Sequence, residues 1–181
     1  LLYVGEVLYM VFKKIVLTGV FLALCLILPF FTGQIPQIGS MLSPMHIPVF
    51  ICGLVCGWPY AAIIGFIAPL LRHGMFYMPP LITAIAMAFE LFAYGGFTAL
   101  FSKILPQKPE YIYVSLILSM IFGRFVWGTA RYIIALLTHS EFTIAAFISG
   151  AFITALPGII CHLIIVPLVV IAIRKSGVIN D

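Results

Sequence analysis

Four ionisable residues interrupt long apolar stretches of this sequence: Glu90, Arg124, Arg131 and His162. A charged side chain inside a bilayer is costly, so residues of this kind usually mark a functional site. Counted from the outer ends of the predicted membrane spans at about 1.5 Å per residue, Glu90 lies about 15 Å deep, Arg131 about 10 Å and Arg124 about 21 Å. Glu90 can therefore meet either arginine, and the spacing leaves this choice open.

Both arginines share a helical face with an aromatic residue. Arg124, Trp127 and Arg131 follow i, i+3, i+7 spacing, and Tyr94 lies four residues after Glu90 on another predicted helix. If the two faces meet, they form a charged pocket with aromatic walls that opens outward and suits a small polar molecule. Two simpler interpretations stay open: a Glu90–Arg124 ion pair that only locks two helices, and an Arg131 side chain that extends to the outer interface.

His46 and Arg72 are candidate residues at the outer edge of this pocket. His46 stands where a long loop meets the second predicted span, and Arg72 begins the loop after the third. Both are interpreted as lid residues of a binding site, or else as interfacial groups that face water. His162 lies about 20 residues into the last predicted span, so we expect a packing histidine in its cytoplasmic half.

The composition places these residues in a membrane protein. Of the 181 residues, 64% are hydrophobic and 8% are charged, whereas soluble domains have about 45–50% and about 25%. This length holds about five or six spans with short connections, so residues 1–181 are expected to form a single transmembrane domain. The nine Lys and Arg residues are dispersed rather than clustered, which argues against binding of nucleic acid.

Motifs of the common enzyme classes are missing from the sequence. It contains no G-x-x-x-x-G-K phosphate loop, no H-E-x-x-H metal site and no G-x-S-x-G nucleophile elbow. The four cysteines lie in apolar stretches without metal-ligand spacing and are expected to be small buried residues. We therefore expect no enzyme activity, no metal and no cofactor, and we do not expect the chain to hydrolyse ATP itself.

The hydropathy pattern predicts an all-α polytopic membrane protein with a bundle of six transmembrane helices. The stretch 43–72 decides this number, because it holds two short apolar segments around Trp58-Pro59. Small residues recur there every four positions, which lets helix backbones approach closely, at Gly53, Gly57, Ala61 and Gly65. The predicted spans are 15–31, 47–57, 60–71, 80–104, 111–137 and 142–173, the last with a kink at Pro157-Gly158.

The positions of the charges favour two crossings over one in the stretch 43–72. With six spans in total, six of the flanking Lys and Arg residues lie inside and Arg72 alone lies outside, whereas five spans put four outside and three inside. The positive-inside rule therefore selects six, with Trp58-Pro59 as a tight cytoplasmic turn and with both termini in the cytoplasm. The uncharged loop 32–45 is then external, and loops of this length tend to be functional.

Three blocks of the sequence resemble a known family: MHIPVFICGLVCGWPYAAIIGFIAPLL, MPPLITAIAMAFELFAYGGFTAL and GRFVWGTA. They are similar to the substrate-binding S component of energy-coupling factor (ECF) vitamin transporters, and the likeness covers Lys13 to Ile173. It implies a multi-pass protein of a prokaryotic plasma membrane that captures a vitamin or vitamin precursor outside the cell. It also implies partners, namely a transmembrane coupling subunit and two cytoplasmic ATPase subunits.

The resemblance also implies a docking surface on the first helix. Members of the family dock on the coupling subunit through small residues spaced by four, a pattern that Gly19 and Ala23 match and Ile27 does not continue. Their ligand sites lie near the outer face, under the loops after the first and third spans. This place agrees with the two predicted outer loops and with the depth expected for Glu90, Trp127 and Arg131.

The resemblance leaves the ligand open between two kinds of vitamin. Two arginines in the outer half suit a carboxylate such as that of pantothenate, whereas Trp127, Tyr94 and Glu90 suit the ring of pyridoxine or hydroxymethylpyrimidine. The rival hypothesis is a stand-alone secondary transporter or a membrane enzyme, which would work without ATPase partners.

Overall fold

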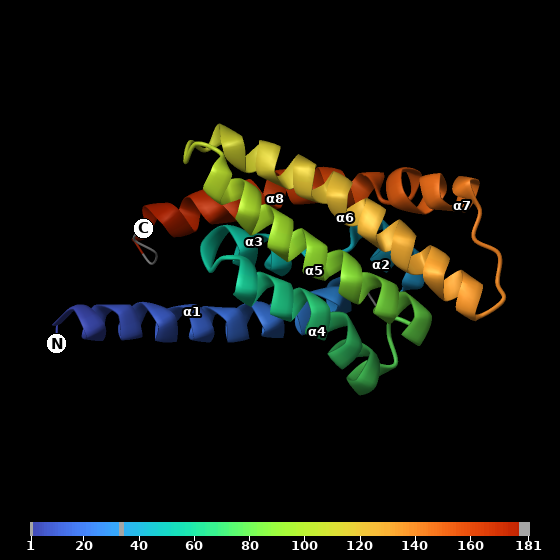
Figure 1. The fold of residues 1–181 in the computed structure, drawn as a ribbon, viewed down its shortest axis with the longest axis horizontal. Helices are drawn as coiled ribbons and strands as arrows, with labels where there is room; N and C mark the ends of the chain where they lie inside the picture. Colours follow the sequence, from blue (N-terminus) through green and yellow to red (C-terminus); the bar gives the residue numbers. More distant parts are fainter. Residues whose placement is uncertain (1, 33–34, 178–181) are drawn as a thin grey trace.

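Every regular element that the structure describes is helical (Figure 1). The computed structural model describes residues 2–32 and 35–177. A 3₁₀ turn at Leu28–Thr32 follows the first helix, and a π-helical turn at Ser149–Ile153 precedes the last. The helices are α1 (Leu2–Ile27), α2 (Pro36–Leu42), α3 (His46–Val55), α4 (Trp58–Phe76), α5 (Leu81–Ile104), α6 (Glu110–Leu137), α7 (Ile144–Ile148) and α8 (Leu156–Lys175). The all-α prediction is confirmed.

Four helical segments of the described chain are long and apolar enough to cross a membrane. They are Gly5–Thr32, Leu81–Ile104, Glu110–Leu137 and Ile144–Lys175. Large apolar side chains also cover much of the outer surface, as expected of helices that contact lipid. The prediction of a polytopic membrane protein is confirmed.

The stretch 43–72 folds as two helices, α3 and α4, with a turn one residue earlier than predicted. Gly57 has φ 98°, a backbone conformation that only glycine adopts readily, whereas Trp58 and Pro59 already belong to the first turn of α4. Proline is favoured there because its missing N–H would have no helical partner in any case. The helix continues to Phe76, so Arg72 lies within α4 rather than at the start of a loop.

Small residues bring α4 close to α5. A Cβ atom added to Gly95 would lie 2.6 Å from the carbonyl oxygen of Ala61, and one added to Gly65 would collide with the backbone of Leu91. The close approach expected at Ala61 and Gly65 is therefore confirmed, whereas Gly57 serves the turn instead.

The core of the bundle lies where α3, α5, α6 and α8 meet. Its largest fully buried side chains include Phe50, Leu91, Tyr94 and Leu116. α5 packs against α3, α4 and α6, so it runs through the middle of the molecule (Figure 1). Glu90, halfway along α5, is thereby carried into the interior.

The last predicted span is interrupted, and the external loop is partly helical. The π-helical turn separates α7 from α8, and Pro157 lies in the first turn of α8. The chain is thus broken just before Pro157 rather than kinked at it, because proline begins a helix more easily than it continues one. The loop 32–45 contains α2, which packs on α8.

The two ends of the chain lie at the same end of the bundle, together with the connection between α5 and α6 (Figure 1). α2, the α4–α5 connection and the α6–α7 connection lie toward the other end. α1 begins at Leu2 rather than at the predicted residue 15, and its N-terminal part extends beyond the other helices. Much of α1 is therefore unburied, which matters for partner docking.

Candidate ligand-binding site

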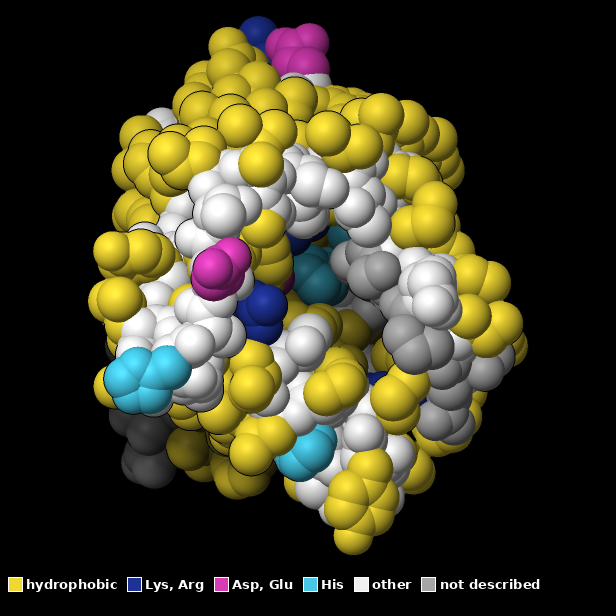
Figure 2. Space-filling view, turned by 90° about the vertical axis from the view of Figure 1, so that its right-hand side faces the viewer, with side chains coloured by type: hydrophobic (Ala, Val, Ile, Leu, Met, Phe, Trp, Pro, Cys, Tyr) yellow, Lys and Arg dark blue, Asp and Glu magenta, His cyan; other side chains and the backbone are white. Residues whose placement is uncertain are grey.

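A cavity of about 490 Å³ opens at the end of the bundle opposite the two termini (Figure 2). Its lining comes from the turn after α1, from α2, α3, α4, α5 and α6, and from the π-helical break before α8. Methionines and prolines supply most of its apolar wall. The polar residues that line it are Thr32, Gln37, Ser43, His46, Arg72, Thr83, Glu90, Arg124, Trp127 and Thr154.

Glu90 is the charged centre of the cavity wall. Its side chain is only 2% exposed, and its Oε1 accepts hydrogen bonds from Arg124 Nη1 at 2.7 Å and from Tyr94 Oη at 2.9 Å. Tyr94 itself is buried behind the wall, where Gly123 of α6 leaves room for its ring. The ion pair that the sequence left open is thus made with Arg124, which stands level with Glu90 on the facing helix.

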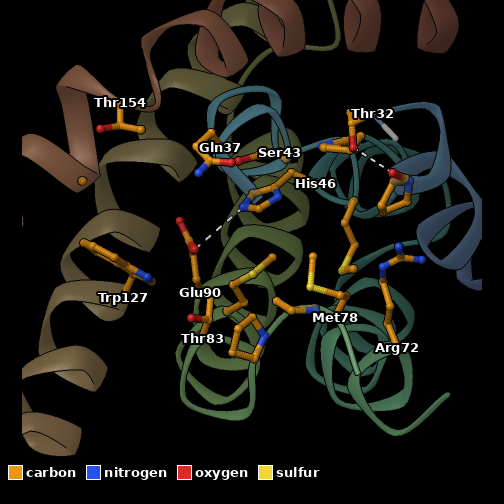
Figure 3. A pocket seen from close by; sticks show the side chains of 18 of the residues that line it. Thr32, Gln37, Ser43, His46, Arg72, Met78, Thr83, Glu90, Trp127 and Thr154 are labelled. Atoms are coloured by element: carbon orange, nitrogen blue, oxygen red, sulfur yellow. Dashed lines mark hydrogen bonds and ion pairs between the residues drawn. The ribbon is translucent and has the colours of Figure 1, made fainter. Parts of the chain in front are cut away.

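His46 reaches the same carboxylate from α3. Its Nε2 lies 3.7 Å from Glu90 Oε2, and its ring stacks on that of His162 with centroids 5.7 Å apart and planes 13° apart (Figure 3). His162 Nε2 in turn lies 3.1 Å from the carbonyl oxygen of Ser43. His46 is 2% exposed, so it is a wall residue and not the water-facing group that was one alternative. His162 is buried and has the packing role expected of it, and its partners His46 and Ser43 both line the cavity.

Arg72 forms part of the cavity wall on the α4 side (Figure 3). Its Nη1 donates a hydrogen bond of 2.5 Å to the carbonyl oxygen of Leu26, near the end of α1. Its guanidinium lies beside an edge-to-face pair of aromatic rings, 4.7 Å from the centroid of Phe30 and 5.3 Å from that of Phe76. Arg72 is 2% exposed, so its predicted placement on an open loop was wrong. Because α4 continues past Arg72 to Phe76, the side chain lies inside the bundle.

Trp127 forms the wall on the α6 side (Figure 3). Its ring stacks on Phe147 with centroids 6.2 Å apart, and it meets Phe142 edge to face at 6.0 Å. A Cβ atom at Gly150 would lie 2.8 Å from this ring, so only glycine gives the indole its place. These contacts fix the orientation of a large aromatic surface beside the cavity.

Arg131 does not line the cavity formed by the described residues. Its guanidinium lies 5.7 Å from the ring centroid of Phe142, and its side chain is partly exposed. Arg131 shares the helical face of Trp127 but stands one turn nearer to the end of α6, beyond the reach of Glu90. This position fits the alternative of a side chain that extends to the interface.

Comparison with protein families gives one match. The sequence model of the family described as ECF transporter, substrate-specific component, matches residues 13–170. This chain belongs to that family. Comparison of this S component with curated proteins and with solved structures found no match.

Membership settles several expectations about this S component. It is a multi-pass membrane protein and a subunit of a transporter, not an enzyme. It works with an ECF energising module and has a substrate, whose identity the family match does not specify. The resemblance that the three sequence blocks indicated is confirmed.

Several cavity residues of the S component were not singled out from the sequence. They include Gln37, Ser43, Met78, Thr83 and Thr154. Thr83 precedes Glu90 by seven residues, so tracing the face of α5 outward would have found it. Gln37 belongs to the loop 32–45, which was expected to be functional, but its helix α2 was not predicted, and no sequence pattern pointed to Thr154 in the break before α8.

None of the four thiols of the S component lines the cavity formed by the described residues. Cys25, Cys52 and Cys56 are buried and Cys161 is partly buried, so the expectation of small packed side chains is confirmed for the first three. In the part of the chain that the structure describes, no three His, Cys, Asp or Glu side chains are grouped so as to hold a metal ion.

Proposed function

We propose that this S component captures a water-soluble vitamin or vitamin precursor from outside the cell and delivers it through a partner module driven by ATP. The observation that carries the proposal is the buried Glu90–Arg124 pair in the wall of a cavity of about 490 Å³. A concave, largely apolar site with a few fixed polar groups is the usual form of a small-molecule site. Pantothenate, pyridoxine and hydroxymethylpyrimidine are the candidate ligands.

Six membrane crossings with cytoplasmic termini support capture from the outside. In this arrangement α3 and α4 cross as a short hairpin, and α1, α5, α6 and α7–α8 supply the other four crossings. Lys13, Lys103 and Arg174 then lie on the cytoplasmic side, in agreement with the positive-inside rule. The cavity opens at the opposite end from the termini, so in the proposed arrangement it faces outward.

The exposed face of α1 supports docking on the transmembrane coupling subunit. Gly19 and Ala23 are both exposed, and a Cβ atom at Gly19 would meet no other atom within 4 Å. Small residues on a lipid-facing helix allow another helix to approach closely. The coupling subunit and two cytoplasmic ATPase subunits complete the proposed transporter.

Ligand capture can be tested on the purified protein. The S component is purified from cells grown with mixed vitamins, bound compounds are identified by mass spectrometry, and their affinity is measured by calorimetry. Thr83→Trp should abolish binding, because the added ring fills the cavity. Thr129→Trp, which adds the same bulk on the exposed face of α6, is the matched control. Absence of any retained compound or saturable binding would refute the proposal.

The rival hypothesis, a stand-alone secondary transporter, has a separate test. Vesicles that contain only this chain are loaded with a proton or sodium gradient, and uptake of the retained compound is followed. We expect no uptake without the coupling subunit and the ATPases.

A further inference from the structure

The charges that line the cavity do not balance. Arg124 and Arg72 carry two positive charges, whereas Glu90 is the only acidic residue among the described residues of the lining. His46 adds no negative charge in either protonation state. With no ligand present, the described wall therefore has an excess of at least one positive charge.

Glu90 is already fully engaged by donors of the protein. Arg124 and Tyr94 both donate to its Oε1, and His46 approaches its Oε2. A cationic ligand would have to compete with a buried guanidinium at 2.7 Å for this carboxylate. Displacing that partner leaves a buried charge unpaired, which costs several kcal/mol. The wall is thus poorly suited to a positively charged molecule.

Arg72 is the source of the excess charge. The ion pairs found among residues 2–32 and 35–177 all involve Glu90, so Arg72 has no acidic partner there. The carbonyl oxygen of Leu26 and the rings of Phe30 and Phe76 stabilise its guanidinium only as dipole and quadrupole partners. A buried charge of this kind is normally paired with an opposite charge.

Some polar atoms near Glu90 also lack a hydrogen bond. In the described structure neither ring nitrogen of His46 has one, although Nε2 lies 3.7 Å from Glu90 Oε2, and neither does Arg124 Nε. Both residues line the cavity, and both are buried. A guanidinium N–H can only donate, so an acceptor oxygen on a bound molecule is the group that it requires.

The remaining wall is suited to an uncharged body. Met45, Met78 and Met87 line it together with four prolines, and Trp127 and Arg72 lie on opposite sides of the cavity (Figure 3). Methionine side chains adapt to irregular apolar shapes. A molecule held here can therefore place one polar end near the arginines and its body against thioethers and the indole.

We propose that the ligand of this cavity is a small monoanion, with one carboxylate that pairs with Arg72 and a largely apolar remainder that packs against the methionines and Trp127. The inference rests on the proposed function and narrows it to one charge class. Among the candidate ligands it favours pantothenate over the neutral ring compounds.

Two pairs of matched compounds test the charge directly. Pantothenate is compared with pantothenyl alcohol, and 4-pyridoxate with pyridoxine; within each pair the acid carries a carboxylate where its partner has a neutral alcohol. Affinity for the wild-type protein in lipid nanodiscs is measured by calorimetry. For whichever pair of compounds binds, the acid should bind at least about 10-fold more tightly than the alcohol, as expected for a charge-assisted contact.

Variants test whether Arg72 causes the preference for the acid over the alcohol. Arg72→Met should reduce the preference for the acid to less than about 3-fold, a difference of under about 0.7 kcal/mol. Arg174→Met, which removes the same charge at the far end of α8, should leave it unchanged. If Arg72→Met fails to fold, Arg72→Lys keeps the charge without the planar stacking and should retain the order of preference.

The outcomes separate this inference from the proposed function. Equal or tighter binding of the alcohol overturns the inference but leaves vitamin capture intact. If none of the four compounds binds, the inference is tested by the net charge of the compound retained from cells. An anionic compound supports the inference, and a neutral or cationic compound overturns it. If nothing is retained and nothing binds, both the proposed function and the inference fail.

Discussion

At the scale of single residues, the protein concentrates its few intramembrane charges around one carboxylate. Glu90 is held by Arg124 and Tyr94 and faced by His46, and all four side chains are buried. A network with so many fixed donors has little freedom to rearrange. It therefore holds these side chains in one arrangement instead of adjusting to different ligands.

Removal of Glu90 should destabilise the fold as well as binding. Glu90→Gln leaves Arg124 buried without a counter-charge, which we expect to lower the free energy of unfolding by about 3–5 kcal/mol. Unfolding of the purified protein in detergent, followed by heat or denaturant, measures this loss. Glu110→Gln, at the exposed start of α6, is the control and should be neutral. Equal stability of the two variants would show that the pair contributes little.

Trp127 should contribute to affinity through its ring. Trp127→Ala removes the fixed aromatic surface and should weaken ligand binding by roughly 10- to 100-fold, whereas Trp127→Phe should retain part of it. Calorimetry with the compound retained from cells measures both. Phe125→Ala, on the exposed side of α6, controls for the loss of an aromatic residue from the same helix. Unchanged affinity of Trp127→Ala would remove the indole from the site.

At the scale of elements, the cavity depends on how closely α4 and α5 pack. The two helices approach through Gly65, Gly95 and Ala61, and this contact sets where Arg72 and Glu90 stand relative to each other. Because backbones touch there, even one added methyl group must move a helix.

Two neighbouring glycines of α5 provide a matched test of this packing. Gly95→Ala places a Cβ against Ala61 and should destabilise the protein by roughly 1–3 kcal/mol, although alanine favours a helix. Gly96→Ala meets no atom within 4 Å and should be neutral or slightly stabilising. Thermal unfolding in detergent measures both. If the two variants are equally stable, α4 and α5 are not in tight contact.

At the scale of the whole molecule, the two ends of the bundle differ in structure. The cavity opens at one end, whereas the termini and the α5–α6 connection lie at the other. α1 runs along the side with much of its surface unburied, so a partner can approach there without obstructing the cavity.

Cysteine labelling tests the proposed orientation of the molecule. In a background without native cysteines, Ser43→Cys and His73→Cys should react with a membrane-impermeant reagent added to intact cells. Trp58→Cys, in the exposed first turn of α4, should react only after permeabilisation. Labelling of Trp58→Cys from outside would contradict six crossings.

Substitution on α1 tests where the partner docks. Gly19→Leu adds bulk to an exposed face, so it should reduce co-purification with the coupling subunit at least about 10-fold while ligand affinity stays unchanged. Gly5→Leu, another exposed glycine of α1 with no neighbour within 4 Å, is the control. Intact co-purification of Gly19→Leu would place the docking surface elsewhere.

The sequence by itself determined the class of the protein, its family and most of its helices. Composition and apolar segments suffice for this, because a bilayer requires long apolar helices whatever their packing. The bounds of α5 and α6 were predicted to within one residue, and Glu90 was predicted to be an intramembrane charge that could meet either Arg124 or Arg131.

Only the tertiary structure decided which residues share the cavity. It selected Arg124 over Arg131, moved Arg72 from a loop into the wall and brought in α2 and the break before α8. These choices depend on helix rotation, helix length and close contacts between distant segments, which hydropathy does not encode. The charged pocket inferred from Glu90 and its arginines thus became a cavity in which Arg72 has no acidic partner among the described residues, and this charge leads to the proposed anionic ligand.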